Sequence, residues 1–524
     1  MFRWIAVLAV VMSFRGVHNV DAQTLASDDK VLSEIWSEAM DNSQLEQLAH
    51  ELFDVIGPRL VGSPQMNKAH DWAVDKYRGW GISAQNEEWG KWRGWERGVT
   101  HIDLLEPRVR TLEGTMLAWS PDTGAEGVTA PLTILADTDS VGFQAWLPNV
   151  KGKFVLMSVP PITGRSNDNW EEFALKTTFE KMKAERDSLR KNWSERIKRY
   201  GYTTRTLPVA LESAGAAGII TNRSTGGWGV DRIFAAYTKQ IPTVDVALED
   251  YGLLFRLVEH GDDPKVRIVA TSSETGTTPA FNTVARIEGS EKSDEYVMLS
   301  AHFDSWDGAS GATDNGTGTL TMMEALRILK KVYPNPRRTV LVGHWGSEEH
   351  GLHGSRAFVK DHPEIVGKLQ ALFNQDNGTG RVVRISGSGY SNSGEFLGRW
   401  LSKVPQEVAT HIKLTVPGMP AGGGSDHASF VAAGAPGFGL GSLSWDYFRY
   451  TWHTNRDTYD KVVFDEVRNN VILAASLIYL ASEDPEFFPR EKRLLPVNPD
   501  SGERRTWPKP RNPDRAGRLG KAKK

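Results

Sequence analysis

The sequence predicts an α/β fold in which helices sandwich a mostly parallel mixed sheet, with a small α+β unit inserted into it. Apolar, β-branched runs at 296–301 and 339–345 are typical of strands that are buried on both faces. Between them, apolar residues of 317–332 recur at helical spacing, and Pro334 follows the last of them. This alternation of strand and helix favours a parallel sheet covered by helices.

Changes in composition and in strand and helix pattern along the chain predict its domains. A main unit comprises 23–124 and 276–482, and it is discontinuous because 125–275 form the inserted α+β unit. A charged helical segment at about 166–204 interrupts the inserted unit. The last segment, 483–524, is rich in proline and basic residues, and this composition predicts a disordered tail.

Further elements follow from local patterns. The apolar residues of the charged segment fall on one helical face, which either packs on its own domain or serves as a lid or homodimer contact. The tryptophans of 80–95 are expected to pack between elements. We expect a helical region at 33–81, a helix-to-strand unit at 209–222, and strands at 131–135, 153–158, 241–247, 266–270, 371–374 and 437–441.

The N-terminal segment 1–22 has the features of a secretory signal. An arginine precedes a short apolar run, and small residues precede a cleavage position near Ala22. The pattern predicts export to the periplasm or the extracellular space, and the alternative is a buried helix. No later run approaches the ~20 apolar residues that a membrane-spanning helix needs.

Composition excludes several kinds of chemistry. The chain of 524 residues has 62 basic and 65 acidic residues, a formal charge of −3, so it has no general electrostatic reason to bind nucleic acid. Cysteine is absent, which excludes disulfides, thiolate metal ligands and cysteine nucleophiles. Any metal ligands must therefore be oxygen or imidazole groups.

Acidic and imidazole side chains follow the predicted strands at the points where the strands end. The carboxyl ends of parallel strands meet at one edge of a sheet, so we expect these side chains to lie close together. The set comprises His302, Asp304, Asp314, Glu348, Glu349, Asp376 and His453.

Carboxylate and imidazole groups of this kind suit two divalent ions that share one carboxylate. Such ions lower the pKa of a bridging water, which then needs a base that is not itself a ligand. The adjacent Glu348 and Glu349 can divide these two roles. Asp304 is placed to orient His302. Weaker ligand candidates near the glutamates are His344, His350 and His353.

Five motifs together resemble the co-catalytic dinuclear zinc exopeptidases of the aminopeptidase and glutamate carboxypeptidase type. They are HFDSWDGASGATDNGTG, WGSEEHGLHGS, NQDNGTG, GGGSDHASF and HTNRDT, which begin at 302, 345, 374, 422 and 453. HFDSW and the lengths between motifs point to the carboxypeptidase Q branch. The resemblance covers about 44–481, and the inserted unit resembles a protease-associated domain.

The resemblance implies a role for each matching residue. His302 and Asp376 would bind one zinc ion, Glu349 and His453 the other, and Asp314 would bridge them. The general base would be Glu348. The resemblance also implies a cis peptide bond after Asp314. Asp304 and Asp457 would support the ligands without binding a metal ion themselves. A substrate-site loop would contain Ser425, Asp426 and His427.

Some relatives place a tyrosine before that loop to stabilise an oxyanion, whereas this chain has glycine at 422–424. The oxyanion donor therefore stays open between backbone N–H groups, zinc and another residue.

These observations predict an exported zinc exopeptidase, with two Zn²⁺ per chain, that hydrolyses short peptides or dipeptides. Alternatives are an aminopeptidase on longer peptides, an inactive peptidase-like ectodomain, a single-metal cyclase-type relative and an amidohydrolase acting on non-peptide amides. The inactive form is disfavoured because all five ligands and the base are present. The sequence does not indicate whether the amino end or the carboxyl end of the substrate is recognised.

Overall fold

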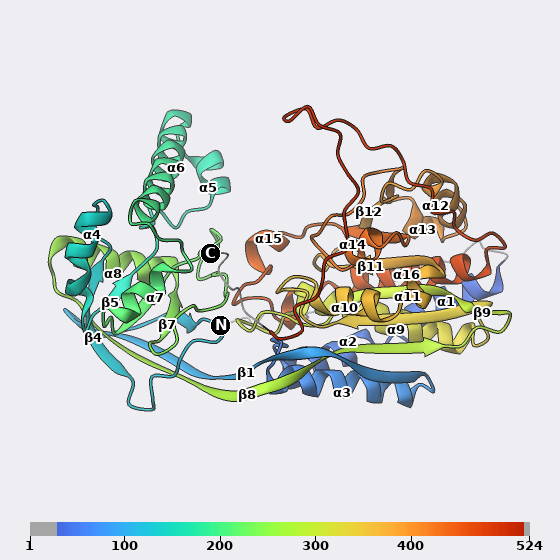
Figure 1. Ribbon diagram of the computed structural model, residues 1–524, viewed down its shortest axis with the longest axis horizontal. Coiled ribbons are helices and arrows are strands. Elements are labelled where there is room, and N and C mark those ends of the chain that lie inside the picture. The colour runs from blue at the N-terminus through green and yellow to red at the C-terminus, as the bar shows by residue number, and fades with distance from the viewer. Residues whose placement is uncertain (1–28, 518–524) are drawn as a thin grey trace, which may run out of the picture.

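The computed structural model describes residues 29–517, and in them a continuous mixed sheet runs through two units (Figure 1). The two longest strands, β1 (Ser83–Glu106) and β8 (Lys265–Ile287), pair antiparallel along most of their length and join the units. The predicted α/β fold with a mostly parallel, helix-covered sheet is confirmed.

The centre of the larger unit is a parallel sheet. Strand β9 (Lys292–His302) lies between β10 (Arg338–Trp345) and β11 (Leu369–Gln375), and β11 pairs in parallel with β14 (Gly437–Ser442). All residues of β10 and β11 are buried, as expected for strands covered on both faces. Towards one edge lie β12 (Val382–Ser386) and β13 (Lys413–Thr415).

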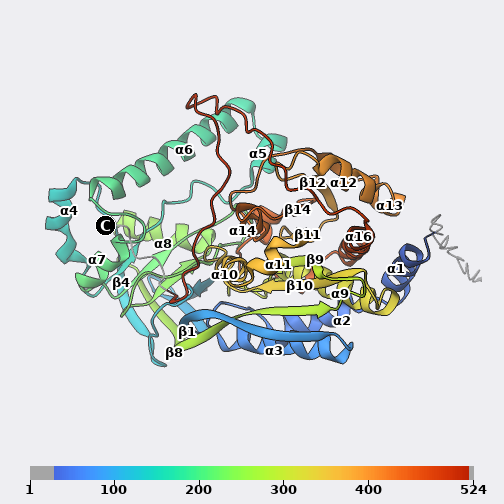
Figure 2. The same cartoon turned by 45° about the vertical axis from the view of Figure 1, so that its right-hand side comes forward.

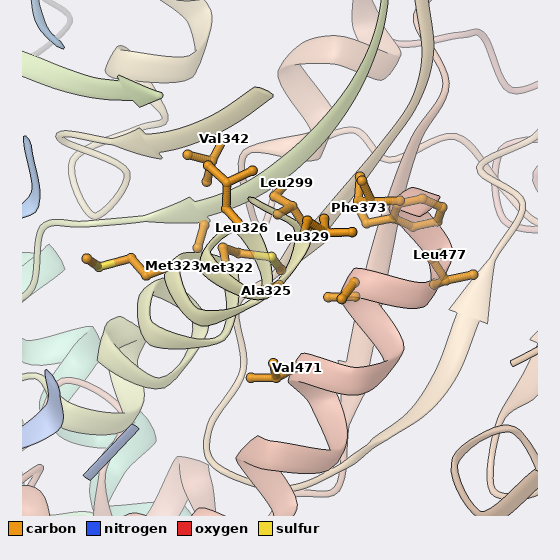
Figure 3. Packing of buried hydrophobic residues seen from close by; sticks show 14 of the residues in the cluster. Leu299, Met322, Met323, Ala325, Leu326, Leu329, Val342, Phe373, Val471 and Leu477 are labelled. Atoms are coloured by element: carbon orange, nitrogen blue, oxygen red, sulfur yellow. The ribbon is translucent and has the colours of Figure 1, made fainter. Parts of the chain in front are cut away.

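Helices cover both faces of this sheet. On one face α9 (Thr317–Val332) and α16 (Phe464–Glu483) pack on alternate strand residues such as Leu299 and Phe373 (Figure 3). The other face, with Met298, packs on α10 (His353–Asp361) and α14 (His427–Ala432). Alternation of side chains along each strand thus supplies two apolar layers.

The smaller unit continues the sheet through β4 (Val128–Ile134), β5 (Phe154–Leu156), β6 (Gly218–Thr221) and β7 (Thr243–Val246). Its edge strand β3 (Gly114–Met116) pairs with β7. This strand precedes 125, so the smaller unit begins earlier in the chain than its predicted boundary.

The charged segment forms α5 (Asn167–Phe173) and α6 (Lys176–Arg199), and Figure 2 shows α6 along the edge of the smaller unit. The apolar face is only partly covered. Trp193 and Ile197 are buried, and Trp193 Nε1 donates to the Met157 carbonyl at 3.1 Å, whereas Leu175 is 77% exposed. The C-terminal half of α6 therefore packs on its own unit.

The remaining elements complete the two units. The tryptophans at 89, 92 and 95 lie buried on β1. The bounds of the remaining elements are α1 (Lys30–Asp41), α2 (Leu45–Ala49), η1 (His50–Ile56), α3 (Pro64–Gly79), β2 (Arg110–Leu112), α4 (Ser140–Trp146), η2 (Leu147–Val150), α7 (Leu207–Ser213), α8 (Leu248–His260), η3 (Ala312–Gly316), α11 (Pro363–Gly367), α12 (Ser393–Leu401), α13 (Gln406–Ala409), α15 (Tyr447–Tyr450) and η4 (Tyr459–Lys461).

The C-terminal segment corrects the prediction of a disordered tail. Residues 484–517 pass over the surface of the larger unit, and Phe488 and Leu495 are buried against it. Arg515 donates to the Trp89 carbonyl at 2.8 Å and pairs with Asp361 at 2.7 Å. The composition is polar on average, but a few apolar side chains and these pairs are enough to order the segment.

The predicted signal segment 1–22 lies outside the described residues. Within 29–517, no helix combines the length and apolar character that a membrane span requires.

Candidate metal centre

The predicted ligands reach one place from separate elements. His302 is the last residue of β9, and Asp376 directly follows β11. Glu349 lies in the turn after β10, Asp314 in η3 between β9 and α9, and His453 in the loop after α15. The carboxyl ends of neighbouring parallel strands bring these segments to one edge of the sheet, as the sequence predicts.

Two groups of side chains have the geometry to hold a metal ion, and Asp314 belongs to both. In one group, His302 Nε2 lies 3.0 Å from Asp376 Oδ1 and 3.5 Å from Asp314 Oδ1. In the other, His453 Nε2 lies 2.7 Å from Glu349 Oε2 and 3.3 Å from Asp314 Oδ2. Each oxygen of Asp314 therefore faces one group, which is the arrangement of a bridging ligand.

The unsatisfied atoms of the cluster indicate what fits between the side chains. Asp314 Oδ2 and Glu349 Oε1 are buried and accept no hydrogen bond from the described residues. A buried carboxylate without a partner is strongly unfavourable, whereas a bound cation compensates its charge. With imidazole and carboxylate as the only donor types, the cluster fits zinc or a similar divalent ion.

Burial and mutual repulsion shift the pKa values of the acidic side chains in the cluster. Burial raises the pKa of Glu349 well above its usual range, and the neighbouring Asp314 raises it further. The pKa of Glu348 is also raised well above its usual range, by burial and by Asp376 and Asp426. Strongly perturbed acids in one cluster are typical of functional sites.

Asp304 holds the segment with the two glutamates against His302. Its carboxylate accepts the N–H of Glu348 at 2.9 Å and of Glu349 at 3.3 Å, and its backbone carbonyl lies 2.9 Å from His302 Nδ1. Because Nδ1 donates to that carbonyl, Nε2 is left free to bind a metal. Asp304 therefore has the supporting position that the sequence predicts.

Asp457 supports Asp314 in a similar way. Its carboxylate accepts the N–H groups of Thr313 and Asp314 at 2.8 and 2.9 Å. Burial and the nearby Asp314 raise the pKa of Asp457 to about 7. The Asp314–Asn315 peptide bond is cis, as the resemblance implies.

Two residues of the site escape prediction from the sequence. Arg59 is fully buried and donates to the carbonyls of Phe303, Ser310 and Gly311, so it fixes the loop that leads to Asp314. Arg59 lies in the segment GPRLVGS at 57–63, whose sequence alone does not reveal this contact.

Tyr447 is the other missed residue. Burial raises the pKa of its hydroxyl well above the usual value, and the adjacent Asp314, Asp376 and Glu349 raise it further. A neutral hydroxyl therefore faces the cluster near Asp314. Its position six residues before His453 is the only sequence signal, and it is weak.

The Ser425–Asp426–His427 loop lies beside the cluster without joining either ligand group. Ser425 Oγ accepts from Asn374 Nδ2 at 2.8 Å. Burial raises the pKa of Asp426 to about 7, and Asp376 and Asp304 contribute. Burial lowers the pKa of His427 to about 4.

The three weaker histidine candidates also lie outside the ligand groups. His344 Nε2 lies 2.7 Å from the Tyr77 hydroxyl in the core. His350 packs among Trp92, Trp119 and Trp306, and His353 Nδ1 accepts the N–H of Asp514 from the C-terminal segment.

The smaller unit contributes one wall of the site. The ring of Phe234 packs edge-on against the ring of His453 at 5.1 Å, and the Ile233 N–H donates to the His453 carbonyl at 2.8 Å. Trp452 stacks on His453 at 3.9 Å. Both units therefore determine the position of His453.

Comparison with known proteins agrees with this geometry. The model of peptidase family M28 matches residues 282–478, which include all five predicted ligands and Glu348. Over these residues the chain is similar to peptidase family M28, and the ligand groups described above lie within the matched region.

Over most of its length the chain is similar to carboxypeptidase Q. The human protein is 26% identical over 460 residues, which are 86% of this chain and 87% of the relative, and the Bos taurus protein is 27% identical over the same length. The family resemblance expected from the motifs is confirmed.

Solved structures show the same fold. A peptidase M28 precursor from Shewanella amazonensis superposes with a TM-score of 0.65 at 24% identity, covering 90% of this chain and 99% of that one. A zinc aminopeptidase from Bacillus subtilis superposes with a TM-score of 0.54 at 19% identity, covering 86% and 97%.

Proposed function

We propose that this protein is an exported metallo-exopeptidase that hydrolyses short peptides or dipeptides with two zinc ions. The observation that carries the proposal is the pair of ligand groups that share Asp314, one oxygen of which faces each group. A site for one metal ion would not need a carboxylate that two ligand groups share. The export part of the proposal rests on the signal pattern of 1–22.

The ligand assignment follows from the two groups. His302 and Asp376 would hold one ion, Glu349 and His453 the other, and Asp314 both. When bound, two zinc ions at such a site polarise a carbonyl and lower the pKa of a water molecule.

Glu348 is the proton carrier of the proposal. It belongs to neither ligand group, yet its carboxyl interacts with His302, Asp376 and Glu349. An unligated carboxylate beside the cluster takes a proton from the attacking water and returns it to the departing amine.

Tyr447 is the best-placed donor for the developing oxyanion. Its pKa is raised, so the hydroxyl keeps its proton, and it already faces Asp314. A fixed donor at this position stabilises charge that appears only in the transition state. This assigns the role that the glycines at 422–424 leave open.

Paired variants of adjacent glutamates test the proposal. We expect Glu348→Gln to retain two zinc ions per chain, measured by mass spectrometry, and to lose about 10²–10⁴-fold in dipeptide turnover. The matched control Glu349→Gln is expected to lose zinc. Dipeptide hydrolysis by Glu348→Gln at the wild-type rate would rule out Glu348 as the base.

A further inference from the structure

The C-terminal segment forms one wall of a cavity on the helices that follow the Glu348–Glu349 turn and the Ser425–His427 loop. This cavity has a volume of about 540 Å³ and lies between α10, α14 and residues 508–512. In both cartoon views the segment, drawn in red, descends past α14 and α10 towards β1 (Figures 1 and 2). Gly422, just before the Ser425–His427 loop, also lines it.

The lining of the cavity combines apolar surface with positive charge. Leu352, Val359 and Ala432 are among the apolar residues. Every charged residue of the lining is a cation, and no carboxylate is present among them; the cations are Arg356, Lys360, Lys509 and Arg511.

Neither guanidinium group forms a direct ion pair, and the side chain of Arg511 is exposed to solvent. In residues 29–517, no carboxylate oxygen lies within 4.0 Å of the side-chain nitrogens of Arg356 or Arg511. Burial lowers the pKa of Arg356 and the charge of Arg511 lowers it further, whereas the carboxylates of Asp426 and Glu348 partly offset this effect. Two like charges that face one cavity without an anion favour the binding of one, and guanidinium groups fit carboxylates especially well.

Arg356 also lies on the side of the cavity that faces the candidate base. A Cβ atom placed on Gly351 would be 3.8 Å from Arg356 Nη1, and the Gly351 N–H donates to the Glu348 carbonyl at 2.8 Å. Glu348 and Asp426 both act electrostatically on Arg356. An anion held by Arg356 would therefore be close to the site of hydrolysis.

The segment that carries Arg511 is fixed on both sides of it. Before it, the ring of Trp507 packs on Tyr390 at 5.4 Å. After it, Asn512 accepts from Lys360 Nζ at 3.1 Å, and Arg515 pairs with Asp361. The position of residues 508–512 over the cavity is therefore set by contacts that do not involve Arg511.

We propose that this cavity is the subsite for the carboxyl-terminal residue of the substrate, whose free carboxylate Arg356 and Arg511 bind. The inference rests on the proposed function and deepens it, because it selects carboxypeptidase or dipeptidase polarity over aminopeptidase polarity. The apolar lining accommodates the side chain of that residue. The C-terminal segment is then part of the substrate site.

Substrate pairs that differ only in the terminal carboxylate test this subsite. We expect wild-type protein to prefer dipeptides ending in leucine over their α-amides. Arg511→Gln should lower kcat/KM for the free dipeptides about tenfold, mainly through KM, and leave the amides unchanged. Arg511→Lys should restore part of the loss, and the tail variant Arg505→Gln, outside the cavity, should match wild type.

A binding measurement separates this inference from the proposed function. We expect N-acetyl-leucine, but not its amide, to bind to wild-type protein by calorimetry and to bind at least tenfold more weakly to Arg511→Gln. Binding with no peptide hydrolysis would refute the proposed function and keep the subsite. Equal behaviour of acid and amide, or an unchanged preference in Arg511→Gln and Arg356→Gln, would overturn the subsite. The subsite would also be overturned if the arginine substitutions affected only dipeptide amides that have an acidic side chain.

Discussion

Phe488 offers a test of whether the C-terminal segment is part of the fold. Its side chain is fully buried, and its ring lies 5.0 Å from that of Phe396, 5.7 Å from Phe438 and 5.8 Å from Tyr390. Its backbone N–H donates to Gln370 Oε1 at 2.8 Å, a bond that a side-chain substitution leaves intact.

The substitution Phe488→Ala removes a ring enclosed by three others. The loss combines the transfer free energy of the ring with the cost of the cavity that it leaves, which together are about 3–5 kcal/mol for a buried phenylalanine. The neighbouring Phe487 is 37% exposed, so Phe487→Ala should cost less than about 1 kcal/mol. The difference between the two variants isolates burial from any general effect on the segment.

Urea unfolding followed by tryptophan fluorescence measures this difference. The chain has two units, so the midpoint of the transition and its slope are compared rather than one extrapolated free energy. We expect a clearly lower midpoint for Phe488→Ala and a nearly unchanged midpoint for Phe487→Ala. Equal midpoints for both variants would show that residues 484–517 do not pack as described.

Three further predictions concern the metal centre and the smaller unit. Asp304→Asn should weaken zinc binding 10–100-fold, measured by competition with a chelator, because an NH2 group replaces one of the two carboxylate oxygens that accept the N–H groups of Glu348 and Glu349. Tyr447→Phe should keep its zinc but lower kcat about 10²-fold, and an unchanged kcat would exclude the hydroxyl as oxyanion donor. Burial and Asp245 raise the pKa of Asp231 to about 8. The folded state therefore binds a proton that the unfolded state releases, and stability falls as pH rises from about 4 to about 8, by up to about 1.4 kcal/mol per unit. Asp231→Asn should flatten this pH dependence of the melting temperature, and an equal slope in both proteins would contradict it.

Local patterns determine much of the fold. The predicted helix 317–332 has the same bounds as α9, and the predicted strand 339–345 differs from β10 by one residue. These elements are buried, so their apolar periodicity is strong. The order of acidic and imidazole residues after such strands is enough to predict which side chains meet, because parallel strands end at one edge.

Features that depend on distant contacts are not predictable in this way. The composition of the C-terminal segment predicts disorder. However, Phe488 and Arg515 form hydrogen bonds with residues that are more than a hundred positions away in the sequence. Tyr447 meets Asp314 only because the fold brings α15 to η3. Arg59 likewise contacts a loop some 250 residues later in the chain. Average composition and residue spacing do not predict such contacts between distant parts of the chain.

Anomalous X-ray scattering at the zinc absorption edge tests the central claim most directly. In crystals of zinc-loaded protein, we expect two peaks about 3.5–4 Å apart, one on each side of the Asp314 carboxylate. One peak should lie between His302 and Asp376, the other between Glu349 and His453. A single peak, or peaks elsewhere in the molecule, would contradict a shared two-metal centre.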